Sequence, residues 1–172
     1  MVLQERWMNL RADTCVTGAG VEIAPYYILE NKEWACVLAV DQQDRVVMVE
    51  QYRHGLGVMS LELPGGVVDD EDGDIATAAR RELAEETGYS CGPLTFVAAI
   101  GANPATHDNR LHIYCARDAQ ATGTTNFDAA EEINVHLVPI PEARRLALSG
   151  AMPHGLQTAA VLLAIEKVMS SK

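Results

Sequence analysis

Glutamates crowd one turn of a predicted helix, in the sequence RELAEETGY, which places Glu82, Glu85 and Glu86 together. At 3.6 residues per turn their side chains project within an arc of about 100°. Arg81 stands four residues before Glu85 and can pair with it, but Glu82 and Glu86 have no obvious partner within the helix. Carboxylates on one rigid face suit Mg²⁺ or Mn²⁺, although a solvated acidic surface has the same composition. The cluster therefore indicates either a cation site or a charged helix face.

The helix that positions these carboxylates has clear ends. Asp74 is a suitable N-cap, no breaker follows until Gly88, and glycine is favoured just beyond a helix C-terminus. Ile75, Ala79 and Leu83 recur at helical spacing and predict a narrow buried stripe. We therefore expect a helix over Ile75–Thr87 that buries this stripe.

Apolar and alternating runs on both sides of this helix predict strands and two closing helices. The strands are expected at 13–17, 21–29, 34–40, 45–53, in SLELPGG up to Pro64, and at 94–100, 111–116 and 133–140. The closing helices are expected at 141–148 and 156–169. This order predicts an α/β fold, an α/β/α sandwich with a mixed sheet and an N-terminal β-ribbon. The polar loops, 101–110 and 117–130, are natural places for function.

Composition bounds the class of protein. The 172 residues suit one domain with a sizeable core, and 48% of them are hydrophobic. The net charge of -11 argues against nucleic acid or an anionic membrane as the main partner. The four cysteines are far apart, the start has no apolar signal region, and AAVLLAI is too short to span a bilayer. We expect a soluble, cytoplasmic protein with reduced thiols.

The acidic helix and the turn before it resemble the Nudix box, which is Gly, a spacer, Glu, seven residues and then Arg-Glu-aliphatic-x-Glu-Glu-x-Gly-aliphatic. Gly66, the run from Arg81 to Glu86, and Gly88 match this pattern, with Tyr89 at its last apolar position. The segments MVEQYRHG, LELPGG, NRLHIYCA and EEINVHLVPI resemble parts of ADP-ribose and nucleoside-diphosphate-sugar pyrophosphatases. The resemblance extends from residue 24 to residue 165.

The spacer departs from the family pattern by one residue. Counting forward from Gly66 puts the spacer glutamate at Asp72, whereas counting back from Arg81 puts it at Gly73. In the family that glutamate mostly supports the geometry between loop and helix. Glu71 or Asp72 can stand in for it, and the sequence assigns the role to neither.

The resemblance implies a magnesium site, with Mn²⁺ as a possible substitute. Its ligands would be Glu82, Glu86 and the Gly65 carbonyl, with Glu85 as a further ligand or bridge. Arg81 would orient the glutamates rather than contact substrate. This would explain the acidic turn, because bound cations neutralise it.

Four residues outside the helix are candidates for contact with substrate or water, and each has a plainer interpretation. By resemblance, Arg53 contacts phosphate, although exposed arginines at strand ends are common. Glu62 contacts substrate or Arg53, or it lies on a solvated face. Tyr27 stacks on a base, or it packs within its strand. Glu131 positions the attacking water, with Glu85 as the alternative base, or it forms a solvated pair with Glu132.

The resemblance implies an enzyme with residues 1–30 as a ribbon that pairs subunits into a homodimer and residues 31–172 as the Nudix hydrolase domain. The expected reaction is Mg²⁺-dependent hydrolysis of a nucleoside diphosphate sugar, with ADP-ribose favoured and AMP and ribose 5-phosphate as products. Other small-molecule substrates are a GDP-sugar, NADH or a nucleoside triphosphate, and capped RNA is disfavoured by the acidic balance. A Nudix-fold module that senses a nucleotide without cleaving it is the alternative from another class.

Overall fold

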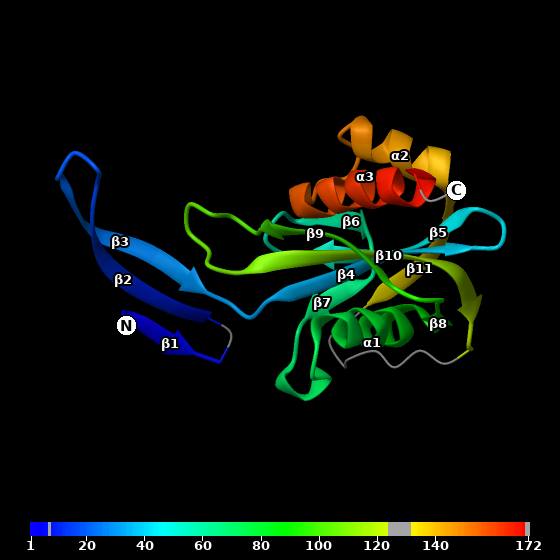
Figure 1. The fold of residues 1–172 in the computed structure, drawn as a ribbon, viewed down its shortest axis with the longest axis horizontal. Helices are drawn as coiled ribbons and strands as arrows, with labels where there is room; N and C mark the ends of the chain where they lie inside the picture. Colours follow the sequence, from blue (N-terminus) through cyan, green and yellow to red (C-terminus); the bar gives the residue numbers. More distant parts are fainter. Residues whose placement is uncertain (7, 124–131, 171–172) are drawn as a thin grey trace.

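A computed structural model describes residues 1–6, 8–123 and 132–170, and its main body is an eight-stranded mixed sheet between helices (Figure 1). Strand β10 runs parallel to β4, and the other described strand pairs of this sheet are antiparallel. The strands are β4 (Trp34–Asp41), β5 (Arg45–Arg53), β6 (Val58–Glu62), β7 (Gly65–Val67), β8 (Tyr89–Ser90), β9 (Thr95–Gly101), β10 (Arg110–Ala121) and β11 (Ile133–Pro139). The main path of the sheet is β11-β5-β4-β10-β8, with β6, β7 and β9 attached to β5, β4 and β10.

Helices cover both faces of this sheet, which confirms the expected α/β/α sandwich. Helix α1 (Ile75–Thr87) lies on one face, and helices α2 (Ile140–Leu148) and α3 (Gly155–Ser170) lie on the other (Figure 1). Asp74 caps α1 by accepting a hydrogen bond from the Thr77 amide at 2.7 Å, and Gly88 ends it in a left-handed conformation. The predicted bounds of α1 are therefore confirmed.

The continuous apolar run of β4 follows from burial on both faces of the sheet, because successive side chains of a strand point to opposite sides. Cys36, Leu38 and Val40 join the core under α2 and α3. The smaller Ala35 and Ala39 join the core under α1, where Ala78, Ala79 and Leu83 of the helix complete the packing. The small residues on this side bring the α1 backbone close to the sheet.

The N-terminal ribbon is a separate three-stranded antiparallel sheet that projects from the body (Figure 1). It comprises β1 (Leu3–Glu5), β2 (Met8–Val16) and β3 (Glu22–Glu30). Arg11 anchors its base, because one guanidinium nitrogen lies 2.8 Å from Glu30 and 3.2 Å from Asp108, in the loop before β10. Side-chain charge thus ties the ribbon to the body.

Some predicted element ends were wrong. Strand β10 continues through the first five residues of the expected loop 117–130, because a register shift after Ala116 and a positive φ at Asp118 let the chain bend and resume pairing. Strand β1 and the first part of β2 were not predicted, and β7 forms where only a Gly-Gly turn was expected. Within the described residues, no helix is both long and apolar enough to cross a bilayer.

Candidate active site

The acidic turn of α1 faces the Gly65–Gly66 backbone of β7, and the two glycines make this approach possible. The Gly65 amide donates to Glu86 at 2.8 Å, and Glu86 is only 4% exposed. A Cβ at Gly66 would lie 2.6 Å from one Glu82 carboxylate oxygen, closer than real Cβ contacts allow. A Cβ at Gly65 would overlap the backbone of Ala35 and Cys36 in β4. Gly66 therefore leaves room for the Glu82 carboxylate, and Gly65 lets β7 lie against β4.

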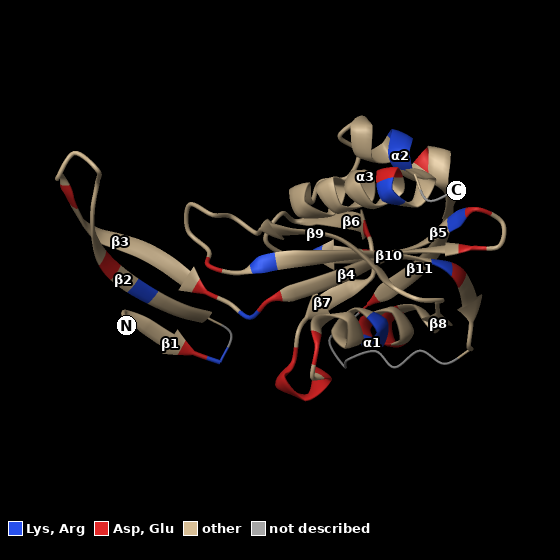
Figure 2. Cartoon of the chain, in the orientation of Figure 1, with Lys and Arg blue, Asp and Glu red and all other residues tan. Residues whose placement is uncertain are grey.

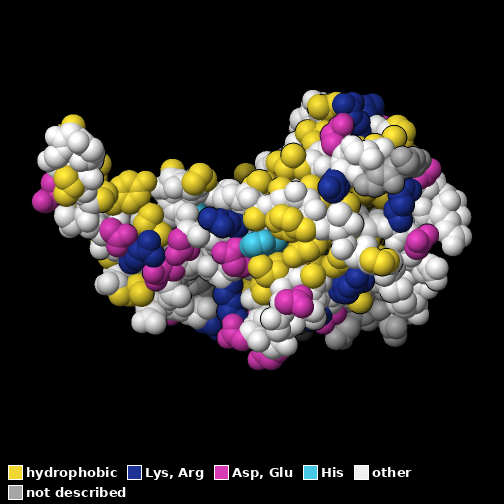
Figure 3. Space-filling model, in the orientation of Figure 1, with side chains coloured by type: hydrophobic (Ala, Val, Ile, Leu, Met, Phe, Trp, Pro, Cys, Tyr) yellow, Lys and Arg dark blue, Asp and Glu magenta, His cyan; other side chains and the backbone are white. Residues whose placement is uncertain are grey.

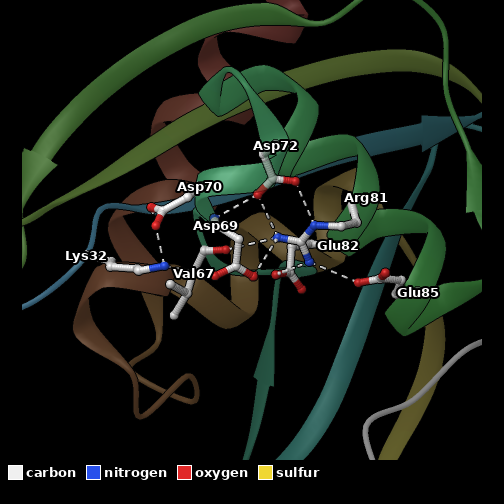
Figure 4. Close-up of polar contacts among 8 residues, drawn as sticks. All are labelled: Lys32, Val67, Asp69, Asp70, Asp72, Arg81, Glu82 and Glu85. Atoms are coloured by element: carbon white, nitrogen blue, oxygen red, sulfur yellow. Dashed lines mark hydrogen bonds and ion pairs between the residues drawn. The ribbon is translucent and has the colours of Figure 1, made fainter. Parts of the chain in front are cut away.

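Arg81 connects the acidic groups around this turn (Figure 4). One terminal nitrogen donates to Glu82 and to Glu85, each at 2.9 Å. The other side of the guanidinium binds both oxygens of Asp72, at 2.8 and 2.9 Å, and also donates to the Val67 carbonyl. The expected pair between Arg81 and Glu85 is present, and the same arginine also pairs with Glu82. A single cationic side chain thus fixes several carboxylates.

The charges of Arg81 and Asp72 stabilise each other. Hydrogen bonds from Arg81 hold the pKa of Asp72 below its usual range, against a smaller opposing effect of burial. Asp72 makes the largest contribution to raising the pKa of Arg81. Both groups are therefore charged at neutral pH, and the side chain of Asp72 is only 4% exposed.

The carboxylates are suited to a hard divalent cation in an open site, where water or substrate supplies some of the ligands. Within the described residues, no three His, Cys, Asp or Glu side chains gather into a preformed metal cluster. Mg²⁺ does not require such a cage, because it usually takes one or two carboxylates and keeps water or substrate phosphate as its other ligands. Glu82 and Glu86, on one face of α1 beside the Gly65–Gly66 backbone, match that donor set.

Arg53 and Glu62 form a bidentate ion pair on the same side of the sheet as α1. Their nitrogen–oxygen distances are 2.9 and 2.6 Å. Glu62 lies opposite Val49, and the strand alternation puts both on the side where Val47 packs under α1. Glu62 is 0% exposed, so the solvated interpretation of this residue was wrong, whereas the Arg53 side chain is 37% exposed.

The ion pair also controls the ionisation of Glu62. Burial by itself would raise the pKa of this carboxyl group, but hydrogen bonds and charge from Arg53, together with smaller effects of Ser60 and His154, outweigh burial and hold the pKa below its ordinary value. Glu62 is thus a buried carboxylate that holds Arg53 at the surface. Contact with Arg53 was one of the expectations for Glu62.

Two residues that support this region were missed from the sequence. Buried Gln157 of α3 accepts a hydrogen bond from the Leu63 amide at 3.0 Å and so connects α3 to the turn before Gly65. Lys32 lies 3.2 Å from Asp69 and 3.5 Å from Asp70. These two acids belong to the loop after β7, which is coloured as acidic in Figure 2. The polar Gln157 close to the apolar run of α3 was a usable signal, but nothing in the sequence linked Lys32 to that loop.

Tyr27 and Glu131 are the remaining candidates. Tyr27 is half exposed and belongs to β3, a strand of the ribbon that lies apart from α1 in Figure 1. Glu131 lies outside the described residues, so its expected role stays a prediction from the sequence. Glu132 is exposed just before β11.

The family of the chain follows from comparison with known proteins. The NUDIX domain model matches residues 31–158, which is most of the chain and includes both α1 and the Arg53–Glu62 pair. The chain belongs to the Nudix family. This match agrees with the box pattern from Gly66 to Gly88.

Individual Nudix relatives resemble this chain at moderate identity. It is 31% identical over 117 residues to the methanol dehydrogenase activator of Bacillus methanolicus, which covers 67% of this chain and 63% of that protein. It is 30% identical over 123 residues to the ADP-ribose pyrophosphatase of Bacillus subtilis (strain 168), which covers 71% of this chain and 66% of that protein. The matches thus span just under two thirds of these relatives' lengths.

A solved structure shows the same fold over nearly the whole chain. It is a crystal structure of an ADP compounds hydrolase, with a TM-score of 0.85 and 20% sequence identity, and it covers 99% of this chain and 91% of that one. The likeness at this identity shows the fold. It extends beyond residues 31–158 to include the N-terminal ribbon.

Proposed function

We propose that this Nudix protein hydrolyses the pyrophosphate bond of a nucleoside diphosphate sugar, with ADP-ribose as the favoured substrate. The observation that carries the proposal is the α1 constellation, in which Arg81 fixes Glu82 and Glu85 while the Gly65 amide holds Glu86. Arg53 lies on the same side of the sheet and is available to a phosphate group. The ADP-ribose pyrophosphatase among the relatives supports the substrate class.

The residues have separate roles in this proposal. Glu82, Glu86 and the Gly65 carbonyl would hold Mg²⁺, with Glu85 as a further ligand or bridge. When bound, the cation stabilises negative charge that develops on pyrophosphate oxygens during attack by water. A chain with a net charge of -11 needs such mediation to bind a diphosphate. Glu131, or else Glu85, accepts a proton from the attacking water.

Product identity tests the activity and the substrate together. The protein is incubated with ADP-ribose, GDP-mannose, NADH or ATP in ¹⁸O-labelled water, with Mg²⁺ or with EDTA, and the products are identified by mass spectrometry. We expect ADP-ribose to give AMP and ribose 5-phosphate, with one ¹⁸O on a product phosphate and no reaction in EDTA. Faster cleavage of another substrate would show that ADP-ribose is not the preferred substrate, while the protein would still be a hydrolase. Binding of these ligands without cleavage of any of them would favour the nucleotide-sensing module.

We also propose that the ribbon, residues 1–30, joins two copies of the chain. Its exposed apolar side chains include Leu3, Met8, Ile23 and Tyr27, and Figure 3 shows apolar groups along the ribbon. An open three-stranded sheet with such side chains is suited to association with a second copy.

Light scattering at micromolar concentration checks this prediction, and we expect the mass of a dimer. Ile23→Lys should shift the protein towards the monomer. Leu163→Lys on α3 is the matched control, because both residues are aliphatic and 41% exposed. A monomeric wild type, or equal behaviour of the two variants, would contradict a ribbon interface.

A further inference from the structure

We infer that Asp72 is the positioning residue of the acidic site, acting through Arg81 on Glu82 and Glu85. The inference rests on the proposed function, since it concerns the same carboxylates. It assigns the role that the lengthened spacer left open between Glu71 and Asp72. Asp72 itself contacts neither Glu82 nor Glu85 in the described hydrogen bonds, so its effect passes through the arginine.

The local fold explains how a longer loop still delivers a carboxylate to Arg81. Residues Asp70–Asp72 form a 3₁₀ turn, closed by a hydrogen bond from the Asp72 amide to the Asp69 carbonyl at 3.1 Å. The Asp69 amide in return donates to the Asp72 side chain at 2.8 Å. Gly73 follows with φ of 74°, a conformation that glycine adopts without strain, and the chain then enters α1 at Asp74. The 3₁₀ turn thus accommodates the one additional residue of the spacer.

The geometry selects Asp72 over its acidic neighbours. Both of its oxygens bind the guanidinium, at 2.8 and 2.9 Å, in the fork arrangement that fixes an arginine in plane as well as in position. Glu71 is exposed, and the Asp70 side chain is 91% exposed and lies 3.5 Å from Lys32 instead (Figure 4). Among the described residues of this loop, Asp72 alone makes a two-oxygen contact with Arg81.

The consequence for the site is electrostatic as well as geometric. Arg81 pairs closely with Asp72, Glu82 and Glu85, at 2.8 to 2.9 Å, whereas Asp69 lies farther away at 3.8 Å. Because both Asp72 oxygens bind the guanidinium, at 2.8 and 2.9 Å, they offset part of its charge and leave Glu82 and Glu85 more negative towards a cation. Without the Asp72 carboxylate, the guanidinium would be drawn towards Glu82 and Glu85 and would compete with the cation for them. Asp72 thus holds Arg81 in a position where it orients Glu82 and Glu85 and does not displace the cation from them.

Calorimetric titration with Mn²⁺, in the absence of substrate and below each variant's melting temperature, tests this role. We expect Asp72→Asn to weaken Mn²⁺ binding by about 10–100-fold, the range typical of residues that orient metal ligands. Asp70→Asn is the matched control, because it removes the same charge from the same loop two residues away, and it should bind like wild type. Asp72→Glu retains a carboxylate and should restore most of the affinity.

Kinetics separate positioning from a general structural effect. Asp72→Asn should lower kcat at limiting Mg²⁺, recover towards wild type at saturating Mg²⁺, and leave the KM for substrate nearly unchanged. Wild-type affinity for Mn²⁺ in Asp72→Asn, or an equal loss in Asp70→Asn, overturns the role of Asp72 while leaving the proposed function standing. So does an Asp72→Glu variant as weak as Asp72→Asn. A wild-type protein that binds no Mn²⁺ overturns the metal site and the proposed function together.

Discussion

Replacing Glu86 by glutamine is expected to lower kcat by roughly 10²–10³-fold, because the variant loses a negative ligand of a cation that supplies several kcal/mol of charge stabilisation. Glu86 is 4% exposed and accepts the Gly65 amide at 2.8 Å. Glutamine has nearly the same size, and its side-chain oxygen can still accept that hydrogen bond. The fold should therefore survive while the turnover is lost. Steady-state kinetics with ADP-ribose over a range of Mg²⁺ concentrations measures the effect.

The control for this substitution is Glu166→Gln on α3, across the sheet from α1. Its side chain is 70% exposed, so the same chemical change there should leave kcat unaltered. Thermal unfolding of both variants should stay close to that of wild type. Near-normal turnover of Glu86→Gln at limiting Mg²⁺ would show that Glu86 is not a ligand and would leave Glu82 and Glu85 as the acidic candidates.

Replacing Arg53 by methionine is expected to lower the free energy of unfolding by about 3 kcal/mol, because it leaves the carboxylate of Glu62 buried without its partner. Glu62 is 0% exposed, and its two oxygens accept hydrogen bonds from Nε and one terminal nitrogen of Arg53. Because Arg53 is partly exposed, we expect a loss of stability at the low end of the range for buried ion pairs. Urea unfolding at neutral pH measures the loss. A double variant, Arg53→Met with Glu62→Gln, should recover part of it, since no charge then remains buried.

The loss should depend on pH in a defined direction. In wild type the pKa of Glu62 lies below its ordinary value, so the pair stabilises the fold above that ordinary pKa and its contribution is lost as pH falls through the folded-state pKa. In Arg53→Met, the effect of burial, which raises the pKa of Glu62, is no longer opposed by the arginine, so the variant regains stability as the carboxyl group takes up a proton. The difference between the two proteins should therefore shrink from neutral to acidic pH.

An exposed pair of the same geometry is the control for Arg53. Arg145 binds both oxygens of Glu142 at 2.7 and 2.6 Å, but the two side chains are 62% and 42% exposed. Arg145→Met should lower stability by no more than about 0.5 kcal/mol, because surface pairs on a helix contribute little. Similar losses from both substitutions, or a pH-independent loss in Arg53→Met, would contradict the account of the buried pair.

The sequence by itself determined the parts of this protein that depend on local spacing. The cap at Asp74, the glycine at Gly88 and the apolar stripe of α1 predicted its bounds, because helix ends and faces follow from neighbouring residues. The same spacing predicted the Arg81–Glu85 pair and put Glu82 beside it. The apolar run from Trp34 to Val40 likewise predicted the strand that the structure has as β4.

Only the tertiary structure decided which distant residues meet. A 3₁₀ turn decided which acid of the lengthened spacer supports Arg81, because it points Asp72 inwards and leaves Glu71 exposed. The partner of Glu62 depended on the β5–β6 register, and the extension of β10 on pairing with β4 and β8 beyond a bend. Spacing along the chain specifies neither a register nor the direction of a loop side chain, because both are set by packing between segments far apart in sequence.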